Sequence, residues 1–145
     1  MTQPRTVRSI IEGRELLTAP ASTRVCDAAR LMKQRKVVAI LVLEDGKVAG
    51  IFTERDALFR VVADERDPAT TTLAAVMTRN PRCIHPDQPF SAAIGMMHDG
   101  KFRRVPVVEN DRPIGMVSAS DAMGPELENF MFSLIVDDQA RDVLA

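Results

Sequence analysis

The stretch GIFTERD, residues 50–56, has a counterpart 65 residues later in GMVSASD, residues 115–121. Each begins with Gly and ends with a hydroxyl residue followed three positions later by Asp. A hydroxyl residue three positions before an acidic residue is typical of a helix start that caps its own first turn. The Gly weakens a strand and usually marks the close approach of a ligand or another backbone. Two interpretations, a helix start and a binding site, therefore stay open.

The similarity extends well beyond these two motifs. When the chain is aligned with itself at an offset of 65 residues, without gaps, one register holds from about residue 14 to residue 57. The apolar run Ile40-Leu41-Val42-Leu43 then aligns with Val105-Pro106-Val107-Val108. Two copies of one unit are predicted. The identical pairs are Arg14/Arg79, Ala28/Ala93, Met32/Met97, Lys36/Lys101, Val42/Val107, Gly50/Gly115, Asp56/Asp121 and Ala57/Ala122.

Each copy has the pattern of a β-α-β-β-α unit, which predicts a mixed α/β (α+β) fold. Apolar residues with spacing near 3.6 predict the first helix of each copy, and apolar runs bounded by turn residues predict the strands. The second helix opens at Thr53 or at Ser118. The expected strands are 15–19, 38–43 and 48–52, then 82–85, 105–108 and 113–117, and short lead-in helices are expected at 7–11 and 73–77. The predicted division is 7–64, 72–123 and a C-terminal helical extension, 124–145.

The extension carries apolar residues at helical spacing. Pro125 stands near its start, where a missing backbone N–H costs nothing. Whether this helix folds onto its own domain or covers another subunit stays open. Its apolar positions are Leu127, Phe130, Met131, Leu134 and Ile135.

Composition excludes several classes of protein. The net charge of −1 gives no sign of a nucleic-acid or membrane partner. The longest apolar run, seven residues from Val37 to Leu43, is far below the roughly 20 that span a bilayer. With no signal-peptide core at the N-terminus, we expect a cytoplasmic protein.

Cys26 and Cys83 form no CxxC, which predicts two buried, reduced thiols. With no nucleophile constellation and no Gly-rich phosphate loop, we expect no enzymatic activity.

GIFTERDAL (50–58) and RRVPVVENDRPIGMVSASD (103–121), with the β-α-β-β-α repeat, resemble the CBS-domain pair, named after cystathionine β-synthase and also called a Bateman module. The resemblance covers roughly Val7–Met123. It implies two copies packed through their sheets around a pseudo-twofold axis, with two clefts of which one or both often hold AMP, ADP or ATP, and no required cofactor. The resemblance places Thr53 and Asp56 in one cleft and Ser118 and Asp121 in the other. The hydroxyl would lie near the ribose and phosphates, and the Asp would bind the ribose hydroxyls.

Arg103 and Arg104 precede the strand 105–108 and allow two interpretations, a solvated edge or a phosphate clamp. The first copy has Val38 and Ala39 at these positions. Because the resemblance directs the basic residues of one copy to the other copy's cleft, we expect phosphate to be neutralised mainly beside Asp56. The Asp121 cleft is then expected to be weaker or to prefer an uncharged adenosine compound. The ligand-binding set implied by the resemblance is Thr53, Arg55, Asp56, Ser118, Asp121, Arg103, Arg104, Val105, Pro106, Ala19, Ile84 and His85.

The predicted function is a non-catalytic regulatory module that binds an adenine nucleotide and signals to an unknown effector protein. The expected assembly is a homodimer. A first alternative is a structural homodimeric interaction module whose clefts stay empty. A second alternative is a redox or metal sensor that uses Cys83 and His85. These two residues stand two positions apart on a predicted strand and would therefore point to the same side, and His98 could be a further ligand.

Overall fold

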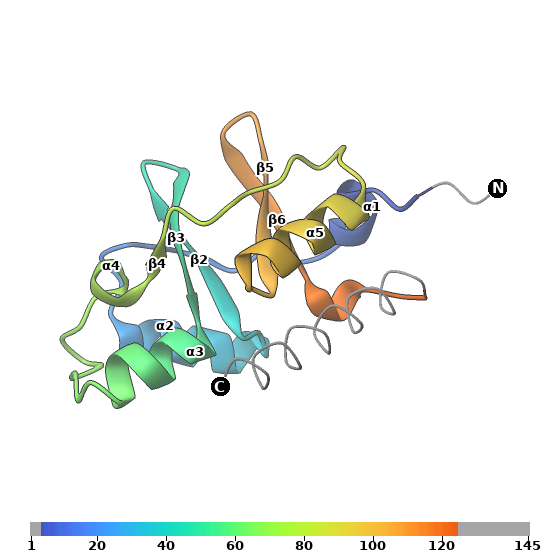
Figure 1. Ribbon diagram of the computed structural model, residues 1–145. Helices are drawn as coiled ribbons and strands as arrows, with labels where there is room; N and C mark the ends of the chain where they lie inside the picture. The colour runs from blue at the N-terminus through green and yellow to red at the C-terminus, as the bar shows by residue number, and fades with distance from the viewer. Residues whose placement is uncertain (1–3, 125–145) are drawn as a thin grey trace, which may run out of the picture. The chain divides into compact units, whose positions relative to one another are not determined.

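The computed structural model describes residues 4–124, which form two compact units (Figure 1). Within this range, unit 1 combines residues 4–14 with residues 82–109 and 115–124. Unit 2 combines residues 15–81 with the short segment 110–114. The predicted mixed α+β fold is confirmed. The predicted C-terminal helix lies outside the described residues.

Unit 2 is built on a four-stranded sheet with the strand order β1-β2-β3-β4. The strands are β1 (Thr18–Pro20), β2 (Ala39–Glu44), β3 (Lys47–Thr53) and β4 (Thr78–Arg79). β1 runs parallel to β2, and the two later pairings are antiparallel. Two helices, α2 (Val25–Arg35) and α4 (Leu73–Val76), belong to this unit. The short helix α3 (Glu54–Asp56) follows β3 and continues as the π-helical segment η1 (Ala57–Val62).

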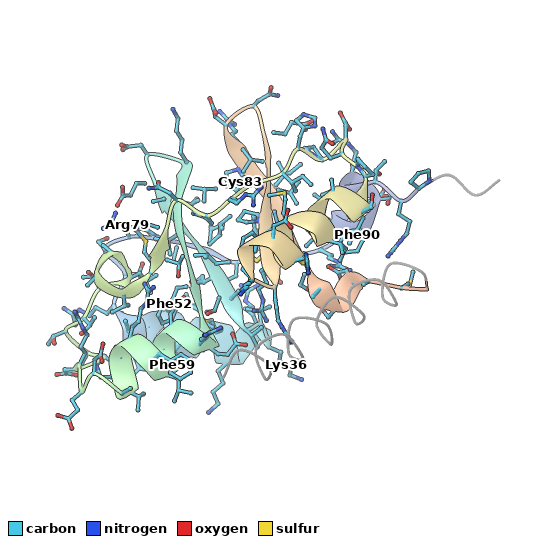
Figure 2. All side chains as sticks on the ribbon, in the orientation of Figure 1. Lys36, Phe52, Phe59, Arg79, Cys83 and Phe90 are labelled. Carbon is cyan, nitrogen blue, oxygen red and sulfur yellow. The ribbon has the colours of Figure 1, made fainter. Side chains whose placement is uncertain are left out.

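The core of unit 2 forms because α2 has one apolar face. Val25, Ala28 and Met32 recur at helical spacing and are buried in one cluster with Ile40 and Phe52. Figure 2 labels Phe52, which is completely buried. Leu73 and Val76 of α4 complete this cluster.

β5 (Arg104–Glu109) and β6 (Arg112–Ser118) pair as an antiparallel hairpin. Unit 1 contains β5 and the end of β6 from Gly115, with helices α1 (Val7–Ile11) and α5 (Phe90–Gly100). Phe90, labelled in Figure 2, is completely buried with Ala93 and Met97 against Val105 and Val107. The expected strand 82–85 is reduced to one bridging residue, Ile84, which pairs in parallel with Val107. After β6 the chain makes a single 3₁₀ turn, η2 (Ala119–Asp121).

The internal repeat is confirmed in the backbone. Ala19 pairs in parallel with Val42, and Ile84 pairs in parallel with Val107, which are the same two pairs shifted by 65 residues. Helices α2 and α5 each end at a lysine in the left-handed conformation, Lys36 with φ 56° and Lys101 with φ 57°. The two hairpin turns also match: Asp45 and Gly46 in one, Asn110 and Asp111 in the other, all have positive φ. Such two-residue turns fit the right-handed twist of the flanking strands.

The lead-in helices lie where the sequence did not predict them. The helix that precedes the first copy packs with the second copy, and the helix that precedes the second copy packs with the first. α1 leads into the first copy but lies beside α5 of the second, and the N–H of Val7 donates to the carbonyl of Gln88 at 2.9 Å (Figure 1). Conversely, the N–H of Leu73 in α4 donates to the carbonyl of Thr23 at 2.9 Å. The cause is apolar burial, because Val7, Ile10 and Ile11 all enter the unit 1 core.

The repeated glycines are explained by these lead-in segments. A Cβ at Gly50 would lie 2.5 Å from Met77 Sδ and 2.8 Å from the carbonyl oxygen of Thr78. A Cβ at Gly115 would lie 2.8–2.9 Å from three side-chain atoms of Ile11. Each Gly therefore permits the close approach of the segment that packs on its strand. The sequence left open whether a ligand or another part of the chain lies against each Gly. In the structure another part of the chain lies there.

Within residues 4–124, none of the helices is long and apolar enough to cross a membrane.

Candidate functional site

The Asp56 carboxylate lies at the start of α3 and caps it. Its Oδ2 accepts a hydrogen bond from the backbone N–H of Thr53 at 2.9 Å and from Thr53 Oγ1 at 3.2 Å. The N–H of Asp56 donates in return to Thr53 Oγ1 at 3.4 Å. This reciprocal pair is a capping box, so the predicted helix start at Thr53 is confirmed.

The other oxygen of Asp56 is also engaged inside unit 2. Thr78 Oγ1 donates to Oδ1 at 3.3 Å, and Arg60 Nε lies 3.8 Å from the same atom. A carboxylate offers about four lone-pair directions. Asp56 is only 7% exposed, and protein groups approach it along most of these directions. A ligand hydroxyl would have to displace Thr78 or Arg60 from Oδ1.

The Asp121 carboxylate has fewer partners. Its Oδ2 accepts from the N–H of Ser118 at 2.8 Å, and its Oδ1 is paired with Arg14 Nη2 at 2.8 Å. The two nearby hydroxyl groups, Ser118 Oγ and Ser120 Oγ, are 2.5 Å apart. The Asp121 side chain is 10% exposed and that of Arg14 is 49% exposed. The carboxylate is therefore held almost buried, whereas its guanidinium partner extends into solvent.

A pocket of about 370 Å³ opens beside Asp121 within unit 1. Arg5 Nη2 donates to the backbone carbonyl of Asp121 at 2.9 Å, and its guanidinium carbon lies 5.3 Å from the ring centre of Phe90. The second arginine, Arg14, is aimed at the pocket by the turn after α1, where Gly13 has φ 75° and the N–H of Arg14 donates to the carbonyl of Ile11. The lining residues are Arg5, Ser9, Ile10, Arg14, Ser120, Asp121 and Met123.

The sequence did not lead us to expect these arginines beside Asp121. The Asp121 site was expected to lack strong phosphate neutralisation, yet Arg14 contacts its carboxylate directly and Arg5 lines the same pocket. The sequence offered one signal, the match of Arg14 with Arg79 in the repeat register. That signal could not be used because α1 was assigned to the first copy, whereas it packs in the same unit as Asp121.

A second expectation changes at Ser118. The sequence predicts that a helix opens there, but the described residues form only the single turn Ala119–Asp121 and then extended backbone at Ala122. A helix N-terminus is therefore not available as the phosphate site of this motif within residues 4–124. Among the described residues of unit 1, the arginines beside Asp121 are the cationic groups that could bind a phosphate there.

The other predicted site residues differ in accessibility. Thr53 and Arg55 belong to unit 2, where Arg55 is exposed and lies over the ring of Phe59 at 5.4 Å. In unit 1, Arg103 and His85 are exposed and Arg104 is half-buried. The remaining four are buried, so their side chains have little surface to offer a ligand: Ala19, Ile84, Val105 and Pro106.

The prediction that both thiols are buried is wrong. Cys26 is half-buried and Cys83 is exposed, and neither forms a disulfide bond. Partial burial nevertheless raises the pKa of the Cys83 thiol above its ordinary value. Since the thiolate is the reactive form, this environment does not activate Cys83.

His85 does have metal-binding neighbours, but they are not the expected ones. Among residues 4–124, His85 forms a potential metal-ligand group with Asp87 and Glu109, and neither Cys83 nor His98 belongs to it. Arg8 already pairs with both carboxylates, with Nη2 2.6 Å from Glu109 Oε2 and 3.1 Å from Asp87 Oδ1. These hydrogen bonds raise the pKa of Arg8, first through Glu109 and then through Asp87. The cluster is an exposed ion-pair network around a guanidinium.

The comparison with protein families matches this chain twice. The CBS domain model matches residues 7–63 and 73–124, which together make up most of the chain. The chain therefore belongs to the CBS domain family, as the sequence motifs predicted. Proteins of this family generally act as regulatory modules and not as catalysts.

Individual proteins agree with this assignment. The CBS domain-containing protein CBSCBSPB1 of Arabidopsis thaliana is 36% identical over 96 residues, which is 66% of this chain and 18% of that protein. The chain spans about a fifth of the length of the curated relatives that it matches first.

Two solved structures share the fold over most of the chain. A protein with CBS domains from Burkholderia ambifaria MC40-6 is 31% identical, with a TM-score of 0.75 and coverage of 91% of this chain and 95% of that one. The CBS domain pair of protein MJ0100, solved with 5′-methylthioadenosine and S-adenosyl-L-methionine, is 25% identical, with a TM-score of 0.73 and coverage of 82% and 93%.

Proposed function

We propose that this CBS-domain pair is a non-catalytic regulatory module that binds an adenine nucleotide such as AMP, ADP or ATP beside Ser118 and Asp121. The observation that carries the proposal is the pocket in unit 1, whose lining combines the nearly buried carboxylate of Asp121 with two arginines. Its volume of about 370 Å³ falls within the range of roughly 300–1,000 Å³ that is usual for small-molecule sites.

The chemistry of the pocket fits the two polar parts of a nucleotide. The Asp121 carboxylate can accept hydrogen bonds from the two neighbouring hydroxyls of a ribose. Guanidinium groups bind phosphate oxygens in a bidentate manner, and Arg5 and Arg14 supply two of them. The MJ0100 domain pair, which binds two adenosine compounds, supports an adenosine ligand for this chain.

A second site of the same kind is proposed at the other copy of the motif. It would use Thr53, Arg55 and Asp56 of unit 2. Because Thr78 and Arg60 already contact Asp56 Oδ1, a ligand there must exchange existing contacts for new ones. We therefore regard the Asp121 pocket as the stronger candidate for the nucleotide site.

Regulation by such a module needs a partner that reads its state. We propose a cytoplasmic homodimer whose two repeats, residues 7–64 and 72–123, bind the nucleotide and act on an effector protein. The apolar side chains of Leu58, Phe59 and Val62 are more than half exposed in unit 2 and offer surface for such contacts.

A thermal-shift screen of the protein tests this proposal. It compares AMP, ADP, ATP and adenosine with zinc and other divalent metal ions, each from micromolar to millimolar concentration. A ligand that binds only the folded state adds about 2.7 kcal/mol of stability at a hundredfold excess over its dissociation constant. We expect adenine nucleotides to stabilise the wild-type protein and Asp121→Asn to reduce that shift. No shift with any adenine compound would favour the ligand-free structural module, and shifts with metals alone would favour a sensor built on His85.

A further inference from the structure

The Arg14–Asp121 ion pair occupies the group that a ribose would use. Arg14 Nη2 lies 2.8 Å from Asp121 Oδ1, and the N–H of Ser118 holds Oδ2 at 2.8 Å. Adenosine entering this pocket must therefore compete with Arg14 for the carboxylate. If it succeeds, the guanidinium loses its counter-ion.

A phosphate group changes this balance. Among residues 4–124, two arginines, Arg5 and Arg14, line the pocket together with Asp121. A phosphorylated ligand brings an anion that can replace Asp121 as the partner of Arg14, and charged hydrogen bonds of this kind are among the strongest in proteins. An uncharged nucleoside brings no such replacement.

The geometry permits the exchange. Arg14 is 49% exposed, so its side chain can turn toward a ligand without leaving a buried position. Asp121 is 10% exposed and fixed by Ser118, so it stays in place. Arg5 is oriented by the carbonyl of Asp121 and the ring of Phe90, and its guanidinium remains at the pocket as a second cation.

We propose that Arg14 makes this pocket selective for phosphorylated adenosine compounds by exchanging partners. In the free protein Arg14 pairs with Asp121. When a nucleotide binds, Arg14 pairs with its phosphate, and Asp121 Oδ1 becomes an acceptor for the ribose hydroxyls. Arg14 is thus a specificity-determining residue. This inference rests on the proposed function, because it concerns the same pocket.

The exchange has a consequence that a merely structural role of Arg14 would not produce. Removal of the guanidinium should weaken the binding of AMP, because the phosphate loses a partner. The same change should leave the binding of adenosine unaltered or strengthen it, because Asp121 is released. A structural role would weaken both ligands to the same degree.

Isothermal titration calorimetry with AMP and with adenosine tests the inference on the full chain. The variants are Arg14→Gln, the charge-conserving Arg14→Lys, and Arg8→Gln as a control that removes one exposed arginine from the same segment. Asp121→Asn identifies the binding phase that belongs to this pocket. Circular dichroism in urea confirms that each variant folds.

We expect Arg14→Gln to weaken AMP at the Asp121 phase by about tenfold or more, with adenosine unchanged or tighter. Arg14→Lys should keep part of the preference for AMP, and Arg8→Gln should alter neither ligand. An equal loss for AMP and adenosine, or AMP binding that is unchanged in Arg14→Gln, would overturn the partner exchange while leaving nucleotide binding intact. If wild-type protein binds neither compound at millimolar concentration, the proposed function itself fails.

Discussion

Replacing Gly115 with Ala tests why the motif begins with Gly. The added Cβ would lie 2.8 Å from Ile11 Cδ1 and 2.9 Å from both Cβ and Cγ2 of the same residue. Two of these atoms are close to the backbone of α1, so rotation of the Ile11 side chain cannot remove the overlap. Overpacking of this kind costs about 1–3 kcal/mol of unfolding free energy. We expect Gly115→Ala to lower the stability of the protein by an amount in this range.

The matched control is Gly95→Ala. Gly95 lies inside α5 of the same unit, and a Cβ there would meet nothing within 4 Å. Ala is favoured over Gly within a helix by roughly 0.5–1 kcal/mol, so this variant should be more stable than the wild type. The two Gly→Ala changes should therefore act in opposite directions, although they add the same methyl group.

Urea unfolding followed by circular dichroism measures both changes, since the chain has no Trp or Tyr for fluorescence. Ile11→Ala removes two of the three atoms that a Cβ at Gly115 would meet. In that background the cost of Gly115→Ala should fall by about 0.5 kcal/mol or more, which is the usual signature of residues in contact. A Gly115→Ala variant as stable as Gly95→Ala would refute the packing of α1 on β6.

Two further predictions concern the thiol and the assembly. In a Cys26→Ser variant, alkylation of Cys83 by iodoacetamide should be slow at pH 7 and should become faster as the pH rises. Because burial disfavours the thiolate, the midpoint of this rise should lie above 9.0, the ordinary pKa of such a thiol. A midpoint below that value would indicate an activated cysteine. Light scattering at micromolar concentration should give twice the chain mass of 16.0 kDa, and a mass near that of one chain would refute the homodimer.

Much of the fold could be predicted from the sequence because the two copies repeat the same local signals. The apolar faces of α2 and α5, the hairpin turns and the Thr53 cap all depend on residues close together in the chain. Their positions match the structure to within a few residues. The weak strands were less predictable: 82–85 shrinks to a bridge at Ile84, and β4 was not expected at all. Both depend on pairing with distant segments.

The candidate site was predictable only in part for the same reason. The residues of each motif, such as Ser118 and Asp121, are close in sequence and could be identified from spacing. Arg5 and Arg14 come from the far end of the chain and reach Asp121 only because α1 packs with the second copy. The sequence places α1 immediately before the first copy, and its three apolar residues fit either core equally well by pattern.

A calorimetric titration of AMP shows whether the Asp of each repeat binds an adenine nucleotide. The titration compares wild-type protein with Asp121→Asn and with the double variant Asp56→Asn/Asp121→Asn. Asn keeps the shape of the side chain and an acceptor for the backbone N–H, but it loses the charge and one of the two carboxylate oxygens. We expect the wild type to bind AMP, Asp121→Asn to lose most of the tighter phase, and the double variant to bind no AMP at millimolar concentration. AMP binding of undiminished affinity in the double variant would show that neither Asp binds the nucleotide.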